Sequence, residues 1–577
     1  MTTASAFVPA DLDAAAWSRL EPFYKSLLAR EVGSREEFDA WNADRSELDA
    51  AASEARANLY IRMTCFTDDE SASSAWTRYL EEVSPKLKPM AFALDRKYAE
   101  LADRFAPSDT DRYAVLTRDT RNQVELFREQ NVPLETEIAK LDQEYDRVCG
   151  TMTVDFEGEE RTLPQMARFL QKTDRSVRES AWRAVAERRL AERETIDGIF
   201  DRMLELRHEV AQNAGFDNFR DFQHRNLGRF DYTPDDCARF HEGVEKHAVP
   251  FLRRLDARRK ANLGVDPLRP WDLACDEKGR EPLEPFESGT ELVDKTRDVF
   301  RALDPELAGL FETLGTNASA EQIDRGACLD LDSRKGKASG GYQYMRDRSR
   351  KPFIFMNAAG LHRDVETMIH EAGHAFHSLL CRDEPLLAYR HSMIEFAEVA
   401  SMAQELLTMP HWDAFYPDPA DADRARRQQL EGSIALLPWV ATIDAFQHWL
   451  YTNPGHSRAD RTAHWNSLLQ RFGNDVSWEG LDDARDAQWQ RQGHLFGVPF
   501  YYIEYGIAQL GALGVYQIAL EQGRDVALDN YKRALALGGS RPLPELFQAA
   551  GVPFDLSPDR IGSLVGTVEG RLAELPE

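Results

Sequence analysis

The sequence predicts a mainly α-helical protein with one small β-sheet. Helical patterns of apolar residues dominate the first 230 residues and return after Asn357. Convincing strand signals lie only between residues 326 and 357. With 42% apolar and 29% charged residues, the chain of 577 residues has a globular composition that supports a sizeable core.

The elements follow in order along the chain. Residues 176–214 carry a helical apolar stripe, and Asn213–Gly215 provides a helix stop. Residues 263–290 are rich in Pro, Gly and charge, which is typical of a long loop. The strand signals are GACLDLDS (326–333), GGYQYM (340–345) and KPFIFMN (351–357). No fixed-period repeat is visible, which argues against a solenoid.

The net charge of −27 excludes whole classes of protein. Phosphate binding needs an excess of Lys and Arg, so this balance argues against a nucleic-acid partner, and it disfavours docking on anionic lipid. The basic run FLRRLDARRK (251–260) could suggest a nucleic-acid patch. Because Phe251, Leu252 and Leu255 fall on one face, a solvated amphipathic helix accounts for it better. The chain has neither a P-loop nor a dinucleotide-binding fingerprint.

The cysteines and the apolar stretches indicate the compartment. Six scattered cysteines without a C-x-x-C pair are typical of free thiols in a reducing environment. The first residues lack the basic segment and apolar core of a signal peptide. The most apolar stretches, around 432–446 and 505–520, are interrupted by Asp444 and by Gln509 and Gln517, so neither is expected to span a membrane. We expect a cytoplasmic protein with no membrane partner.

The segment DVETMIHEAGHAFHSLL (364–380) contains His370-Glu371-Ala-Gly-His374. Positions i and i+4 of a helix share a face, so His370 and His374 can present imidazole nitrogens to one metal ion. Glu371 can reach the fourth coordination position and take a proton from the water there. The flanking apolar residues bury this helix, where two unpaired histidines would be costly. The pattern therefore predicts a metal site.

A catalytic zinc ion needs a third protein ligand. Leu380 occupies the position, six residues after the second histidine, where metzincins have a third histidine, so a carboxylate must serve. The next helical segment, 391–407, offers Glu395, Glu398 and Glu405, which could lie on roughly one face. Composition leaves all three open as the ligand, and Glu395 and Glu405 are equally suited to support a ligand histidine. Two histidines and one carboxylate make zinc the expected ion.

Four motifs in this order resemble the oligoendopeptidase F and thimet oligopeptidase family of zinc metallopeptidases. They are GKASGGYQ (336–343), HEAGHAFHS (370–378), FAEVASMAQELL (396–407) and FYYIEYGIAQLGAL (500–513). The resemblance covers roughly residues 200–577. It implies a two-lobed helical metallopeptidase with a deep substrate channel, in which the small sheet adjoins the zinc-binding helix. We accordingly expect an N-terminal helical lobe over 1–200 and the catalytic region over 201–577.

The resemblance also implies which residues hold the ion. The family's third ligand lies in an F-x-E-x-x-S pattern that Glu398 matches, so one zinc ion would be bound by His370, His374 and Glu398. Glu405 and His377 are left as residues that support the ligands, although core packing also accounts for His377.

Two further regions are implied to contact substrate. In 493–509 the family uses a His and a Tyr as hydrogen-bond donors to the oxyanion, and His494 and Tyr505 match best. Tyr501 and Tyr502 could share that role or bind substrate.

The GKASGGYQ segment is, in the family, a Gly-rich loop beside a sheet edge. Gly340 and Gly341 allow close backbone approach, and the strand that begins at Tyr342 could pair with an extended peptide. An ordinary hairpin turn is the alternative for this segment.

We therefore predict a zinc-dependent endopeptidase that hydrolyses internal bonds of short peptides, with Glu371 as the general base. One alternative is a dipeptidyl carboxypeptidase or metallocarboxypeptidase of similar helical fold. The other is a catalytically idle peptide-binding protein, which would have no need to keep Glu371.

Overall fold

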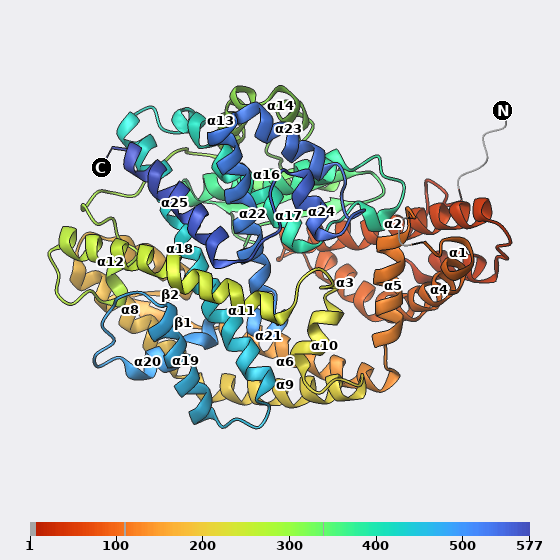
Figure 1. Ribbon diagram of the computed structural model, residues 1–577, viewed down its shortest axis with the longest axis horizontal. Coiled ribbons are helices and arrows are strands. Elements are labelled where there is room, and N and C mark those ends of the chain that lie inside the picture. The colour runs from red at the N-terminus through yellow and green to blue at the C-terminus, as the bar shows by residue number, and fades with distance from the viewer. Residues whose placement is uncertain (1–6, 109–110, 339, 577) are drawn as a thin grey trace. The chain divides into compact units, whose positions relative to one another are not determined.

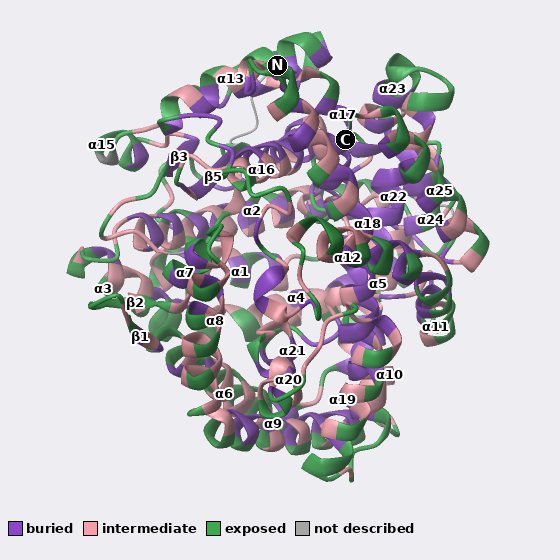
Figure 2. Cartoon of the chain, turned by 90° about the vertical axis from the view of Figure 1, so that its left-hand side faces the viewer, coloured by how far each residue is buried: buried purple, intermediate pink, exposed green. Residues whose placement is uncertain are grey.

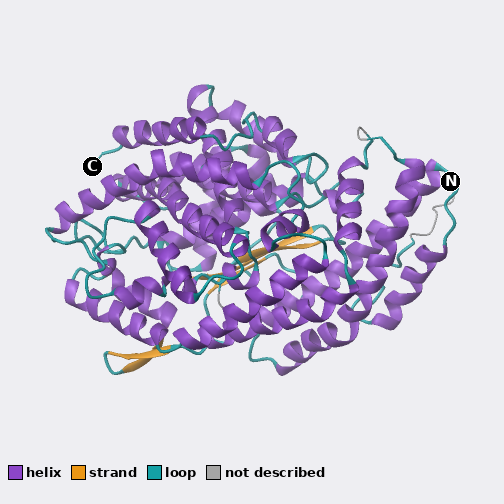
Figure 3. Ribbon diagram, turned by 60° about the horizontal axis from the view of Figure 1, so that its bottom comes forward, coloured by secondary structure: helices purple, strands orange, loops and turns teal. Residues whose placement is uncertain are grey.

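Helices make up most of the structure, as Figure 3 shows. This computed structural model describes residues 7–108, 111–338 and 340–576. The prediction of a mainly α fold is confirmed. In the described part of the chain, no helix is both long and apolar enough to cross a membrane.

The chain folds into two compact units, each assembled from three segments. Unit 1 comprises Met1–Glu125, Glu284–Arg426 and Gly511–Phe554. Unit 2 comprises Leu126–Leu283, Arg427–Leu510 and Asp555–Glu577. Residue 200, where the sequence analysis divides the chain, lies within a helix of unit 2, so these units do not follow that division.

The helices are numbered in chain order, and Figure 1 labels those for which there is room. Those of unit 1 are α1 (Trp17–Ala29), α2 (Arg35–Cys65), α3 (Glu70–Arg78), α4 (Ser84–Phe105), α5 (Ala114–Leu126), α13 (Gly289–Leu303), α14 (Pro305–Glu312), α15 (Ala320–Asp324), α16 (His362–Leu380), α17 (Ile394–Leu407), α23 (Arg524–Leu535) and α24 (Leu543–Ala549).

Those of unit 2 are α6 (Val132–Gly150), α7 (Leu163–Met166), α8 (Arg175–Leu190), α9 (Arg193–Asn213), α10 (Phe219–Asn226), α11 (Pro234–Gly243), α12 (Val249–Leu263), α19 (Arg458–Phe472), α20 (Asp482–Asp486), α21 (His494–Gly497) and α25 (Pro558–Glu574). Two further helices, α18 (Pro419–Thr452) and α22 (Tyr502–Glu521), are divided between the units, and α5 ends at Leu126, the first residue of unit 2.

A three-stranded sheet lies in unit 1, in the order β3-β5-β4. β3 (Leu329–Asp332) pairs in parallel with β5 (Lys351–Ala358), and β4 (Tyr342–Arg346) pairs with β5 antiparallel. All three strands fall in the segments where the sequence predicts them, so that prediction is confirmed. In the described part of the chain β4 has β5 as its one strand partner, which makes β4 an edge strand.

The expectation that strands occur only between 326 and 357 is wrong. β1 (Thr153–Phe156) and β2 (Glu159–Thr162) form an antiparallel hairpin in unit 2. Its turn residues, Glu157 and Gly158, both have positive φ angles of 56° and 81°, as tight hairpin turns require. Val154 alone is buried among the eight strand residues. β1 has just two alternating apolar residues, Val154 and Phe156, and β2 has none, so the pattern is too short to reveal a strand in the sequence.

Other sequence expectations agree with the helix boundaries. The stripe over 176–214 forms two helices, α8 and α9, and α9 ends at Asn213, just before Gly215 with a φ of 88°. The basic run 251–260 lies inside α12. Between α12 and α13 the chain forms loop apart from a short 3-10 turn at Pro270–Asp272.

The helices bury their apolar faces in the usual amphipathic way. Figure 2 shows helices with buried residues on one side and exposed residues on the other. α16 is an exception with few exposed positions, because it packs against β4, β5 and α17 within unit 1. The histidines of the His-Glu-x-x-His motif therefore lie on a helix that is fixed by sheet and helix contacts.

Candidate active site

Helix α16 begins where an acidic side chain caps it. The Asp364 carboxylate accepts hydrogen bonds from the main-chain N–H groups of Ala359 (2.7 Å) and Leu361 (3.0 Å). These bonds anchor the loop that leads into the helix and fix where the helix starts. Apolar residues such as Ile369 and Phe376 then bury one side of α16.

Gly373 sets the spacing between α16 and α17. A Cβ atom at Gly373 would lie 2.5 Å from the carbonyl oxygen of Ala400 and 2.6 Å from Cα of Ser401. Since any side chain would collide with this backbone, the two helices can approach so closely only because the position is glycine. The close approach brings Glu398 of α17 to the two motif histidines of α16.

The metal-binding candidates converge on one carboxylate oxygen. Nε2 of His370 lies 3.3 Å, and Nε2 of His374 lies 3.6 Å, from Oε2 of Glu398. One ligand atom from each of these three residues lies within 4.8 Å of the others. Glu395 and Glu405, which the sequence leaves open as ligands, do not belong to this group.

Neighbouring groups hold the three candidate ligands from behind, and each imidazole is held through the ring nitrogen that does not face Glu398. Nδ1 of His370 lies 2.7 Å from Oε1 of Glu405. A ring nitrogen of His374 is hydrogen-bonded to the main-chain oxygen of Ala397. The hydroxyl of Ser401 donates to Oε2 of Glu398 at 3.0 Å. These contacts orient all three side chains with the ligand atoms facing one another.

The protonation states follow from burial and from the close charges. Burial lowers the pKa of His374 to about 4, which leaves its imidazole neutral. Burial alone would raise the pKa of Glu398, but His374 and His370 outweigh it and lower that pKa to about 2. Burial also opposes the charge on His370, yet its contacts with Glu398 and Glu405 raise its pKa well above 6.5. A metal ion that binds here displaces the proton of His370.

Glu371 has the protonation behaviour of a general base. Its side chain is buried, at 7% exposure, and burial raises the pKa of its carboxyl group to about 7. The main-chain N–H of Gln343, on the edge strand β4, is hydrogen-bonded to this carboxylate. A pKa close to the working pH is suitable for a group that accepts and then returns a proton.

The donor set of this site fits zinc. Two neutral imidazoles and one ionised carboxylate are a ligand combination found in catalytic zinc centres, and they leave one coordination position open. Here the three ligand atoms face one another, and hydrogen bonds to Glu405, Ala397 and Ser401 hold the groups behind them. The residues present are thus able to hold the ion that the sequence implies.

The expected substrate-binding residues of the Gly-rich segment lie at the start of β4. Gly340 has a φ of 96°, and a Cβ at Gly341 would lie 3.4 Å from the carbonyl oxygen of Phe355. Tyr342 stacks on Phe355 with ring centroids 4.8 Å apart, and its hydroxyl lies 2.6 Å from Oγ1 of Thr64. The Tyr342 hydroxyl is therefore engaged inside unit 1.

Sequence reasoning missed a buried ion pair next to this segment. Nζ of Lys337 lies 3.0 Å from Oδ1 of Asp330 and also donates to the carbonyl oxygens of Asp330 and Asp332, both at 3.0 Å. Both side chains are fully buried. Lys337 thus connects the Gly-rich segment to β3, and its sequence context gives no signal of this pairing.

The expected oxyanion donors form an aromatic cluster in unit 2. The His494 ring lies 5.0 Å from that of Tyr502 and 6.1 Å from that of Tyr505, and the Tyr501 and Tyr505 rings are 5.1 Å apart. Burial lowers the pKa of His494, so its ring is neutral at pH 7. The structure brings these four residues together in unit 2, whereas the histidine–glutamate group belongs to unit 1.

The tautomer of His494 is fixed by its neighbours. Trp439 Nε1 donates to Oε1 of Gln492 at 3.2 Å, which leaves the amide nitrogen of Gln492 to donate to Nδ1 of His494 at 2.8 Å. With Nδ1 as an acceptor, the ring proton is on Nε2. His494 is thereby a neutral hydrogen-bond donor.

His377, which the resemblance implied could support a ligand, lies in the core. It is 5% exposed, its ring lies 6.1 Å from that of Phe396, and burial lowers its pKa to about 3. Among the residues that the structure describes, its Nε2 has no hydrogen-bond partner. The structure places His377 in the packed interior of unit 1, beside Phe396 of α17.

Comparison with known proteins gives a consistent picture. A family model described as Peptidase family M3 matches residues 168–558. The chain is 24% identical over 389 residues to an oligoendopeptidase F homolog of Borreliella burgdorferi, covering 66% of this chain and 62% of that protein. It is 24% identical over 339 residues to oligopeptidase PepF of Bacillus subtilis, covering 58% of this chain and 48% of that protein. Both matches span less than two thirds of the relative's own length.

The structural similarity extends over nearly the whole chain. A solved structure of PZ peptidase A with inhibitor 2 has a TM-score of 0.85 to this protein and 27% sequence identity. The match covers 97% of both chains.

Proposed function

This chain belongs to peptidase family M3, and from that premise we propose that it is a zinc-dependent oligoendopeptidase that cleaves internal bonds of short peptides. The family membership confirms the resemblance on which the sequence analysis relied. In the proposal one zinc ion is bound per chain by His370, His374 and Glu398.

One observation carries the proposal. The Nε2 atoms of His370 and His374 face the same oxygen of Glu398, at 3.3 and 3.6 Å, and the buried Glu371 is the residue next to His370. A site of this composition provides metal ligands and a proton acceptor together, which is what hydrolysis of a peptide bond requires.

The proposed roles follow from the chemistry of each side chain. When bound, zinc would act as a Lewis acid and would make a water more acidic. Glu371 accepts the proton of the attacking water and later passes it to the leaving amine. Tyr505 and the neutral His494 donate hydrogen bonds to the oxyanion that develops on the peptide carbonyl, with Tyr501 and Tyr502 close to them.

The proposal extends to substrate and location. The edge strand β4, which begins at Tyr342 after Gly340 and Gly341, is suited to pair with an extended peptide through main-chain hydrogen bonds. All six cysteines are free thiols, which supports a cytoplasmic location.

The test is mass spectrometry of a mixed pool of peptides incubated with the protein, with and without a zinc chelator. We expect internal cuts that disappear with the chelator and return when zinc is added. The pool should contain each peptide with a free and with an amidated C-terminus, because an endopeptidase tolerates the amide.

Each other outcome points to a different function. Cuts restricted to free C-termini would indicate a carboxypeptidase. No cleavage by folded, zinc-loaded protein that still binds peptides would indicate a peptide-binding protein.

A further inference from the structure

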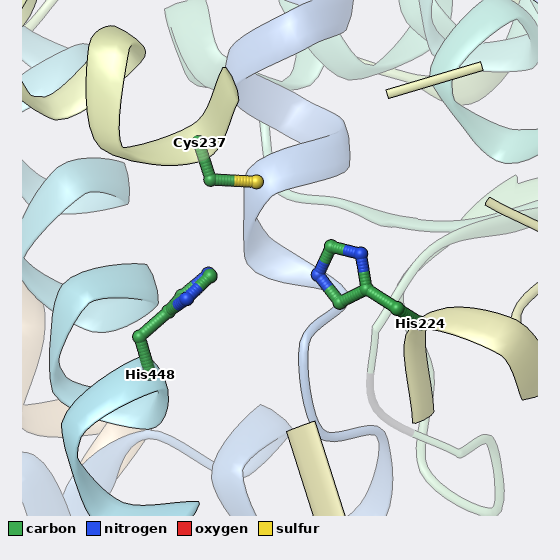
Figure 4. Close-up of side chains that lie close together, drawn as sticks. All are labelled: His224, Cys237 and His448. Carbon is green, nitrogen blue, oxygen red and sulfur yellow. The ribbon is translucent and has the colours of Figure 1, made fainter. Parts of the chain in front are cut away.

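A second group of metal-ligand side chains lies in unit 2, built from residues that the proposed reaction does not use. His224 is on α10, Cys237 is on α11 and His448 is on α18, and the three side chains converge (Figure 4). One ligand atom from each lies within 4.8 Å of the others. All three residues belong to segments of unit 2, so the group is complete within that unit.

Two of the three side chains, His224 and Cys237, are buried, and His448 is half-buried. His224 is 5% exposed, and in the described part of the chain neither of its ring nitrogens has a hydrogen-bond partner. Because an unsatisfied buried nitrogen is costly, two of them on one ring that faces a thiol need an explanation beyond packing.

Metal binding at this group needs an imidazole lone pair and a thiolate. Both ring nitrogens of His224 are without hydrogen-bond partners among the described residues, so a lone pair is available. Binding of the ion would displace the proton of the Cys237 thiol to solvent.

A carboxylate next to the group supplies negative charge. Oδ2 of Asp444 lies 2.8 Å from Nε2 of His241 and 3.3 Å from Nε2 of His448. One thiolate and one carboxylate would balance a divalent cation, which keeps the buried cluster neutral overall.

We propose that His224, Cys237 and His448 bind a second zinc ion, which ties helices α10, α11 and α18 together. Imidazole and thiolate are the donors that zinc prefers in structural sites. In a tetrahedral zinc site the ligand atoms lie about 3.5 Å apart, so the group needs to contract by only about 1 Å. The Asp444 carboxylate lies beside His448, and its Oδ1, which has no hydrogen-bond partner among the described residues, can accept a hydrogen bond from a water in the fourth position.

The proposed ion would stabilise a strained turn beside the aromatic cluster of unit 2. Phe500 has a φ of 70°, which is unfavourable for a residue with a side chain. Its ring packs against the rings of His448 and His224, with centroids 5.5 and 5.9 Å away. A cross-link between these histidines would therefore also hold Phe500, the residue before Tyr501.

The test counts metal ions in a chain whose unit 1 site has been removed. We expect two zinc ions per wild-type chain and one in the double variant His370→Ala/His374→Ala. Substitution with cobalt in that background should give a thiolate-to-cobalt charge-transfer band, because the unit 1 site contains no thiol. The band and the remaining ion should be lost in Cys237→Ser. They should persist in Cys275→Ser, which changes another buried thiol of unit 2. Zinc should raise the melting temperature of the double variant, and less so after Cys237→Ser.

Two results would overturn the proposal. One is a wild-type protein that is saturated with cobalt and shows no thiolate band, a measurement that needs no variant to fold. The other is a double variant that binds no metal while the folded wild type binds one ion. These results differ from a failure of the proposed function. If the unit 1 site binds no zinc, His370→Ala/His374→Ala keeps the metal content of the wild type, whereas Cys237→Ser reduces it.

Discussion

Oε1 of Glu405 lies 2.7 Å from Nδ1 of His370, and the opposite nitrogen of the same ring faces Glu398. A carboxylate on the rear of a ligand histidine fixes which nitrogen carries the proton and makes the other a better donor to a metal. Glu405 therefore acts on the metal site through His370, although the sequence leaves it open as a ligand itself.

The first prediction concerns this contact. Glu405→Gln should weaken zinc binding about 10- to 100-fold while leaving the ligand set intact, because the neutral amide orients His370 less firmly. The measurement is zinc affinity by competition with a chelator. Glu366→Gln is the matched control, since Glu366 lies one turn before His370 on α16 and contacts His362 instead. Equal affinities of the two variants would contradict the role of Glu405.

The second prediction separates the base from the ligands. Glu371→Gln should bind zinc as the wild type does but lose at least about 10³-fold in kcat, because an amide cannot accept the proton of the attacking water. Metal content and single-turnover cleavage should be measured on the same preparation. Substantial residual turnover by the zinc-loaded variant would remove Glu371 from the mechanism.

The third prediction tests the close approach of α16 and α17. Gly373→Ala places a methyl group 2.5 Å from the Ala400 carbonyl oxygen, so the helices must separate. We expect a loss of about 1–3 kcal/mol in unfolding free energy and weaker zinc binding, because Glu398 moves with α17. Denaturant unfolding and zinc competition provide the two readouts.

Gly309→Ala is the control for this substitution. Gly309 lies in helix α14 of the same unit, and among the described residues a Cβ there meets nothing within 4 Å. Alanine should leave stability unchanged or raise it by up to about 1 kcal/mol, since alanine has the higher helix propensity. If both glycine substitutions behaved alike, the tight helix contact would not be what constrains position 373.

Much of the fold could be predicted from the sequence, because periodic apolar patterns and short apolar strands carry local signals. β5 is recognisable from Phe353 to Met356, a continuous buried run. The β1–β2 hairpin is not, because its strands are exposed and bury Val154 alone. Val154 and Phe156 instead pack in a small cluster with Met166, Phe169 and Ala181, contacts that the strand sequence alone does not reveal.

The site was predictable to the extent that its chemistry is local. The i, i+4 spacing of His370 and His374 on one helix identifies a metal-binding pair without any structure. The choice of Glu398 over its helix neighbours required a family resemblance, because it depends on how α17 crosses α16 at Gly373. Residues that support the ligands through the main chain, such as Ala397, carry no side-chain signal at all.

The fourth prediction concerns acid stability. Asp330 is buried beside Lys337 and Arg334. Burial alone would raise the pKa of its carboxyl group, but the contacts with Arg334 and Lys337 outweigh burial and hold that pKa below its ordinary value. A carboxyl group with a lowered folded-state pKa contributes stability above its unfolded pKa of about 3.9, and that contribution is lost as pH falls through the folded pKa.

Asp330→Asn should therefore cost about 3–5 kcal/mol near neutral pH, because Lys337 is left buried without its counter-charge. The difference from the wild type should shrink below about pH 4 in urea unfolding curves. Asp298→Asn, an exposed member of a pair with Arg301, should change stability by no more than about 1 kcal/mol at any pH. A pH-independent cost at Asp330 would mean that packing, and not the ion pair, is what the residue provides.

The last prediction identifies the oxyanion donor within the aromatic cluster of unit 2. Tyr505→Phe removes one hydroxyl and keeps the ring that packs against Tyr501 and Tyr502. If this hydroxyl stabilises the oxyanion, kcat should fall about 10²- to 10³-fold with little change in KM, because the hydrogen bond strengthens only as charge develops. Tyr501→Phe and Tyr502→Phe are matched controls. Each should lower kcat less than about tenfold, which is well below the effect of losing an oxyanion donor. A larger loss of kcat at either control would assign the role to that tyrosine. Small losses of kcat in all three variants would leave the Nε2–H group of the neutral His494 as the donor to test next.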